Sequence, residues 1–202
     1  MLKIILGVAA VCAANLIGPG KVYDLVTNQK RVSDYTEALD IIKALEDGKV
    51  SRLEESIYRR DGYTRKYNRY KKIRVKHLDR YRYVVGKHRL NHFLCRDKRV
   101  KYSPTTYAII NHKLLEKVML IDKASAGQFF ITSGHRTPTY NATLTGATKN
   151  SRHIEGRAVD LIPINISLKE LGKIIRSIEK QRPDLRGYMH IYEKHIHTDV
   201  RE

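Results

Sequence analysis

The sequence predicts an α+β fold in which a small antiparallel sheet has helices packed on one side. Three observations favour it. Short apolar and aromatic runs have the length of strands, and Gly or Pro bounds several of them. Longer segments carry apolar residues at the spacing of a helix face, and one of them opens with a capping box. The last two strand-like runs are separated only by Glu193-Lys194, which indicates a hairpin beneath the helices.

The first 20 residues are typical of a signal peptide or an N-terminal anchor. Lys3 precedes an unbroken apolar run from Ile4 to Ala14, and small residues offer a cleavage site after Ala14. The run is short for a membrane span. We therefore expect export, and an uncleaved N-terminal helix that packs on the domain or anchors the chain is the alternative.

Residues 21–89 are expected to form a helical and strongly basic extension. From Ser33 to Asp47 the apolar residues share one broad helix face, and Gly48 is placed to end the helix. Ser51 and Glu54 have the spacing of a capping box, which predicts a second short helix before Asp61-Gly62.

The strongest charge bias lies between residues 48 and 102. This stretch holds 19 Lys and Arg against 5 Asp and Glu, a difference of +14 out of the chain's +18. Seven tyrosines are interleaved with the cations. The pattern fits attraction to an anionic wall polymer or a membrane surface, and it also fits a solvated basic linker. Nucleic acid is the less favoured partner, because no nucleic-acid motif of fixed spacing is present.

Residues 90–202 are expected to form the main domain. A predicted helix begins at Ser103-Pro104, buries apolar residues as far as Ile121 and ends by Gly127. Ser167 and Glu170 form a capping box that opens a helix to about Glu179. The expected strands are 128–132, 157–162, 187–192 and 195–200. Hydrophobic content of 42% supports a sizeable core, and the two cysteines provide no disulfide framework.

Three residues near the C-terminus form a candidate metal set, His153, Asp160 and His197. Five of the nine histidines lie between His135 and His197. Asp160 interrupts an apolar strand, where a carboxylate is costly unless it is paired or bound to a cation. Two imidazoles and one carboxylate leave a fourth tetrahedral position open, as a catalytic zinc requires. The alternative is a set of polar residues that satisfy one another without a metal.

These residues also carry a family resemblance. Residues 133–141, SGHRTPTYN, resemble the S-G-Y-R-T-P-x-Y-N signature of the zinc D-Ala-D-Ala carboxypeptidases. Residues 151–160, SRHIEGRAVD, are similar to the family's S-x-H-x-x-G-x-A-x-D. Residues 195–201, HIHTDVR, resemble its closing H-x-D-x-R, preceded by the extra histidine of the wider lysostaphin, D-Ala-D-Ala carboxypeptidase and hedgehog group. The resemblance covers roughly residues 90–202.

The resemblance implies roles for individual residues. The zinc ligands would be His153, Asp160 and His197. The catalytic residues would be His195 and Arg136, and the expected substrate-binding residues are Arg136, Ser151 and Asn141. Position 135 is His where Tyr is usual, and Glu155 stands where the family more often has a neutral residue. Relatives with a glutamate base carry it where this chain has Lys194. Glu193 is one residue out of register and would point to the opposite face of a strand. The general base is therefore left open, and His190 and Glu193 are further candidates beside His195.

The resemblance further implies a zinc-dependent peptidase that cleaves peptidoglycan stem peptides. Carboxypeptidase, endopeptidase and phage-type lytic activity all fit these residues. A non-catalytic, zinc-containing module of the same fold that binds the wall or a protein is the alternative function. The expected location is the cell envelope or periplasm, or the host wall if a phage encodes the protein.

Overall fold

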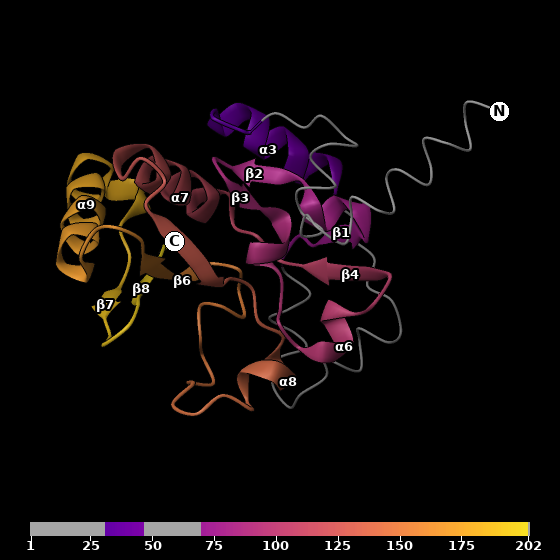
Figure 1. Ribbon diagram of the computed structural model, residues 1–202. Helices are drawn as coiled ribbons and strands as arrows, with labels where there is room; N and C mark the ends of the chain where they lie inside the picture. Colours follow the sequence, from indigo (N-terminus) through magenta and orange to yellow (C-terminus); the bar gives the residue numbers. More distant parts are fainter. Residues whose placement is uncertain (1–30, 47–69, 202) are drawn as a thin grey trace, which may run out of the picture. The chain divides into compact units, whose positions relative to one another are not determined.

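The computed structural model describes residues 31–46 and 70–201. Within them the chain folds as mixed α+β, with small antiparallel sheets and five α-helices, which confirms the predicted class (Figure 1). The α-helices are α3 (Tyr35–Ala44), α6 (Lys98–Lys101), α7 (His112–Ala124), α8 (Pro138–Asn141) and α9 (Leu168–Gln181). Three 3-10 helices are η1 (Leu78–Tyr81), η2 (Leu90–Phe93) and η3 (Pro183–Leu185).

The largest sheet has four strands in the order β5-β6-β8-β7, and all neighbours are antiparallel. Its strands are β5 (Phe129–Ser133), β6 (Ala158–Pro163), β7 (Met189–Ile191) and β8 (Ile196–Asp199). Tyr192 N–H donates to His195 C=O across the turn at 193–194, so the predicted hairpin is present. Two smaller sheets pair β1 (Ile73–Lys76) with β4 (Thr105–Ala108), and β2 (Tyr83–Val85) with β3 (His88–Arg89).

Helices α7 and α9 lie together along one side of the four-stranded sheet (Figure 1). Asn111 caps α7, because its side chain accepts from the N–H groups of Lys113 and Leu114. Ser167 and Glu170 form the predicted capping box of α9. The apolar faces of both helices belong to the main core cluster.

The predicted helix start at Ser103-Pro104 is wrong. Residues Thr105–Ala108 form strand β4 instead, and the helix begins only at His112. β-branched and aromatic residues suit a strand, and this segment has a partner in β1. The cap that sets the helix start is the Asn111 side chain and not Ser103.

The main core extends across the predicted boundary at residues 89 and 90. Ala38 and Ile42 of α3 and Val84 of β2 belong to the same buried cluster as Phe129 and Leu161 of the large sheet. The described residues, 31–46 and 70–201, belong to one compact unit. The expected signal segment 1–20 and the second short helix near Ser51 lie outside the described residues. Among those described, no helix combines the length and the apolar character that crossing a membrane requires.

Strand alternation separates the core from the candidate site. On β6, Val159 and Leu161 are fully buried in the core that α9 covers, whereas Asp160 lies on the other face of the sheet. On β8, Ile196 packs into the core and His197 points to the opposite face. The helices therefore stabilise one face of the sheet and leave the other free for polar side chains.

Candidate metal centre

Four polar residues form a row across the outer face of the large sheet. Ser133 on β5 is paired with Asp160 on β6, Asp160 with His197 on β8, and His197 with His190 on β7. Directly paired residues of neighbouring strands project from the same face. The register therefore brings together a carboxylate and an imidazole that lie 37 positions apart in the chain.

His153 reaches the row from the turn that precedes β6. The turn depends on Gly156, whose φ of +64° suits glycine and whose added Cβ would lie 2.1 Å from Ile109 C=O. His153 Nδ1 lies 2.8 Å from Gly134 C=O, a contact that places the ring proton on Nδ1. The lone pair of Nε2 is then directed at Asp160 and His197.

The three predicted ligands converge on one point. His153 Nε2 lies 3.2 Å from Asp160 Oδ1 and 3.2 Å from His197 Nδ1, and His197 Nδ1 lies 2.9 Å from Asp160 Oδ1. Donors placed about 2.0 Å from a tetrahedral ion lie about 3.3 Å apart. The triangle therefore has nearly the size that a small tetrahedral ion needs, and its three residues could hold a metal ion. The donor set of two imidazoles and one carboxylate is one that zinc accepts.

The carboxylate of Asp160 is held at both oxygens. Arg136 Nη2 donates to Oδ2, and Arg136 Nε donates to Ser133 Oγ at 2.8 Å, so Oδ1 is left for the histidines. Burial alone would raise the pKa of Asp160. The contacts with His153 and His197 and the charge of Arg136 outweigh burial and hold that pKa far below its ordinary value. Asp160 is thus ionised, as a carboxylate ligand of a metal must be.

His197 is oriented by a second carboxylate. Its Nε2 lies 3.8 Å from Asp199 Oδ2, and Asp199 Oδ1 accepts from Tyr188 N–H at 2.7 Å. Burial lowers the pKa of His197, but its hydrogen bond to Asp160 and the nearby Asp199 carboxylate raise it overall to about 8. A carboxylate behind a metal-binding imidazole fixes the ring and raises its basicity.

A cavity of about 600 Å³ opens over this face of the sheet. All three candidate ligands line it, and so do Arg136 and His195. Its aromatic wall contains Tyr188 and Tyr192, and Tyr192 stacks on His195 with ring centroids 4.5 Å apart. Residues 144–148 of the polar loop form another part of the wall. The volume is within the range of a small-molecule or peptide site.

The structure separates the other predicted site residues into two groups. Ser151 lines the cavity, as does His195. Asn141 is buried and donates to Thr148 C=O at 2.9 Å, so it holds the polar loop in place. His190 is exposed beside Tyr192. Glu193 lies in the hairpin turn and is exposed, so the strand alternation expected for it does not apply.

Two residues that support the site escaped the sequence interpretation. Asp199 carries the contact to His197, and the available signal was its place as the Asp of the closing H-x-D-x-R segment, to which no role was given. Lys117 on α7 is fully buried and donates to Asp199 C=O at 2.7 Å and to Glu179 at 2.6 Å. No local pattern distinguishes Lys117, because its partners lie 62 and 82 positions away.

Two of the departures from the family pattern, Glu155 and His135, are accommodated inside the fold. Glu155 is buried between two cations, with Arg152 at 2.6 Å and Arg157 at 3.6 Å. His135 is buried, and its backbone N–H donates to Phe93 C=O at 2.8 Å. Burial, with the nearby His153 and Lys72, lowers the pKa of His135 to about 3, so this imidazole is neutral at physiological pH.

A family model described as Peptidase M15 matches residues 89–199, which include every residue of the centre. Searches of the curated proteins and of the solved structures found no match.

Proposed function

The chain belongs to the peptidase M15 family, a family of zinc D-Ala-D-Ala carboxypeptidases, and on this premise we propose that it is a zinc-dependent peptidase that cleaves peptidoglycan stem peptides. One observation carries the proposal. The three residues that match the family's ligand pattern present their donor atoms within 4.8 Å of one another, and all three line the same cavity. Carboxypeptidase and endopeptidase action, including that of a phage-type lytic enzyme, share this centre.

His153, Asp160 and His197 would hold the ion. A zinc ion there would supply Lewis acidity to the scissile carbonyl and lower the pKa of a water molecule. Gly134 C=O, Arg136 and Asp199 orient the three ligands through the contacts described above. Because the scaffold fixes these contacts, the ligand side chains need little reorganisation when substrate binds.

His195 is the residue best placed to transfer a proton. It lines the cavity two residues before a ligand and its ring is half-buried against Tyr192. An imidazole suits proton exchange near neutral pH. Lys194 and Glu193 lie in the exposed turn, and neither lines the cavity. We assign to Arg136 the additional role of meeting a substrate carboxylate or carbonyl from the cavity wall.

The non-catalytic alternative has one observation in its favour. The described residues that line the cavity include two carboxylates, and both are engaged, Asp160 with the histidines and Asp199 with His197 and Tyr188. No glutamate is therefore available in this lining as a general base. A module that only binds the wall would keep the metal and release no peptide.

Peptide release from purified peptidoglycan, with and without a chelator, separates these functions. The peptidase releases stem-peptide fragments or D-Ala, and the chelator abolishes release until zinc is restored. Binding to peptidoglycan without release, at stoichiometric zinc, would favour the non-catalytic module.

Location and attachment form the remainder of the proposal. The apolar N-terminal run supports export to the cell envelope or periplasm, or action of a phage-encoded protein on a host wall. The basic stretch 48–102 supports attachment to an anionic wall polymer or a membrane surface, with nucleic acid less favoured.

A further inference from the structure

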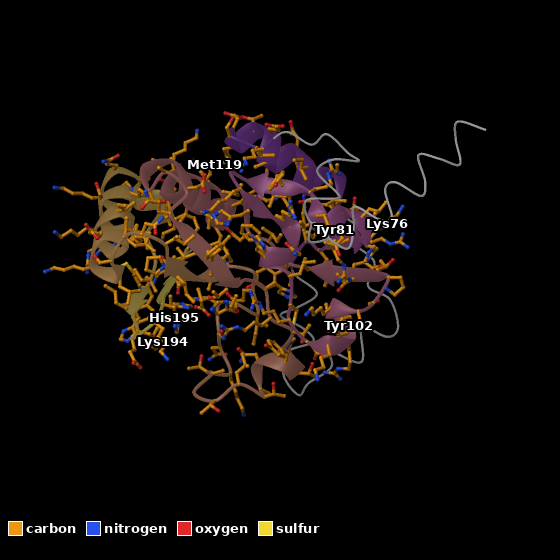
Figure 2. The ribbon with its side chains drawn as sticks, in the orientation of Figure 1. Lys76, Tyr81, Tyr102, Met119, Lys194 and His195 are labelled. Atoms are coloured by element: carbon orange, nitrogen blue, oxygen red, sulfur yellow. The ribbon has the colours of Figure 1, made fainter. Side chains whose placement is uncertain are left out.

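A second cavity, of about 770 Å³, lies apart from the metal centre and shares no lining residue with it. It is formed by η1, η2, α6 and the residues beside them. Two of its lining residues, Tyr81 and Tyr102, are well separated from His195 in Figure 2. The cavity therefore needs an explanation other than peptide cleavage.

All of the formal charges in the lining of this cavity are positive. Arg80, Arg96, Lys98 and Lys101 contribute four positive charges, and no Asp or Glu is among the described residues that line it. The nearest carboxylates in sequence are already engaged. Asp97 forms two hydrogen bonds with the Arg99 guanidinium, and Asp79 accepts from Lys76 N–H at 3.1 Å. The field inside the cavity is thus positive and favours an anion.

Arg80 makes this a built site instead of a chance group of surface lysines. Arg80 is buried, with only 7% of the residue exposed. Nη2 donates to Val100 C=O at 3.1 Å and to Ser103 C=O at 2.7 Å, and Nη1 donates to Lys101 C=O. All of these partners are neutral carbonyls, so no carboxylate offsets the positive charge of the guanidinium. The buried Nε has no hydrogen-bond partner. The same bonds hold the segment that presents Lys98 and Lys101.

His92 adds a neutral donor to the lining. Its Nδ1 accepts from Arg89 N–H at 3.3 Å, which leaves the proton of the neutral ring on Nε2. Burial is the main reason that the pKa of His92 is lowered to about 4, and the charges of His88 and Arg89 act in the same direction. A hydrogen-bond donor therefore persists beside the cations at neutral pH.

We infer that this cavity binds the phosphate groups of an anionic wall polymer. Exposed Arg and Lys around a fixed guanidinium match the repeated charges of a phosphodiester chain. A nucleic-acid site would also present a series of free aromatic faces for stacking. Here Tyr102 is 73% exposed, but Tyr81 is only half-exposed and packs its ring edge-on to His77 at 5.6 Å. The choice of a wall polymer as the source of the phosphates rests on the proposed function.

Two triple variants of the full chain test the assignment. The first is Arg96→Gln/Lys98→Gln/Lys101→Gln, which removes three exposed cations from the cavity. The matched control is Lys169→Gln/Lys173→Gln/Lys180→Gln on the exposed face of α9, which removes the same charge elsewhere. Binding of end-labelled poly(glycerol phosphate) is measured by fluorescence anisotropy at physiological salt. A single-stranded oligonucleotide with the same number of phosphates, and inorganic phosphate, are used as competitors.

The cavity variant should weaken polymer binding roughly tenfold or more, because lost phosphate contacts multiply in the binding constant, and the control should weaken it no more than about threefold. A Lys98→Arg/Lys101→Arg variant should bind as the wild type does. Equal losses in the two triple variants would overturn the site. If the oligonucleotide bound more tightly than poly(glycerol phosphate), and lost that affinity in the cavity variant, the choice of partner would be overturned. The same would follow if inorganic phosphate displaced the polymer at an equal concentration of phosphate groups.

Cleavage of a soluble, phosphate-free stem peptide is measured on the same samples. It should be equal in all variants, because none of the substituted residues lines the metal-centre cavity. Absence of cleavage in the wild type would count against the proposed peptidase, while the anisotropy data would still decide whether the cavity binds phosphate groups.

Discussion

The guanidinium of Arg136 donates to Oδ2 of Asp160, while Oδ1 of the same carboxylate faces the two histidines. The arginine of the signature segment is thereby joined to the middle residue of the candidate metal set, 24 positions away. Its pairing gives Asp160 one fixed orientation before any ion binds.

Arg136→Gln should weaken zinc binding by about 10- to 100-fold, the scale on which residues that orient ligands act. The Asp160 carboxylate loses its charged partner and can rotate. The test is the zinc dissociation constant, measured by competition with a chelating dye. Arg176→Gln, on the exposed face of α9, is the control and should bind zinc as the wild type does. Unchanged affinity in Arg136→Gln would show that Asp160 needs no support.

His135→Phe should flatten the loss of stability in acid. The folded pKa of His135 is about 3, below the ordinary value of about 6.5, so the unfolded chain binds a proton here that the folded chain does not. Stability from the neutral, buried ring is complete above about pH 6.5 and is lost as the pH falls toward 3, by at most about 1.4 kcal/mol per pH unit. Urea unfolding between pH 4 and 8 measures it.

Other acid-sensitive groups remain in that variant. The effect of His135 is therefore read from the difference in unfolding free energy between the variant and the wild type at each pH. The gap in unfolding free energy between His135→Phe and wild type should move in favour of the variant as the pH falls. His77→Phe, at an exposed position, should give no such trend. Parallel curves for wild type and His135→Phe would mean that His135 titrates normally.

Lys117→Met should lower the free energy of unfolding by about 3–5 kcal/mol, because Glu179 then keeps a partly buried charge without its partner. The double variant Lys117→Met/Glu179→Leu should recover much of that loss, since no unpaired charge remains. Thermal and urea unfolding of the metal-free protein provide the comparison. A double variant as unstable as the single one would assign the loss to Asp199 C=O, the other partner of Lys117.

His195→Ala should keep zinc and lose roughly 100-fold or more in turnover, the usual scale for a general acid or base. Glu193→Gln should change turnover little, because Glu193 lies in the exposed turn. His190→Ala is the second comparison, since this histidine shares the row with His197 but does not line the cavity. An inactive Glu193→Gln with zinc in place, beside an active His195→Ala, would make Glu193 the base.

Much of the sheet and the α9 helix could be predicted locally. The apolar run around Asp160, the capping box at Ser167 and the two-residue turn at 193–194 depend on neighbours in sequence. The start of α7 could not, because Pro104 imitates a helix start and the strand at Thr105–Ala108 depends on pairing with β1. The partners in this pairing, from Lys76 with Thr105 to Ile73 with Ala108, are distant in the chain, so neither segment alone predicts it.

The same distinction holds for the site. His153, Asp160 and His197 were predicted together because a carboxylate in an apolar strand and spaced histidines are unusual locally. The bond from Arg136 to Asp160 and the buried Lys117 depend on strand register and helix packing, which the sequence pattern does not express. The sequence predicts only a basic stretch where the structure has the cationic cavity. The cavity depends on Arg80 binding backbone carbonyls instead of a carboxylate, and that choice is made by the fold.

The most direct test of the central claim is the zinc stoichiometry of single-site variants after dialysis against a zinc buffer, measured by atomic emission. We expect about one zinc per chain in the wild type and in His190→Ala, and little or none in His153→Ala, Asp160→Ala and His197→Ala. Circular dichroism confirms that each variant is folded. Stoichiometric zinc in folded His153→Ala and Asp160→Ala would contradict the assignment of the metal centre.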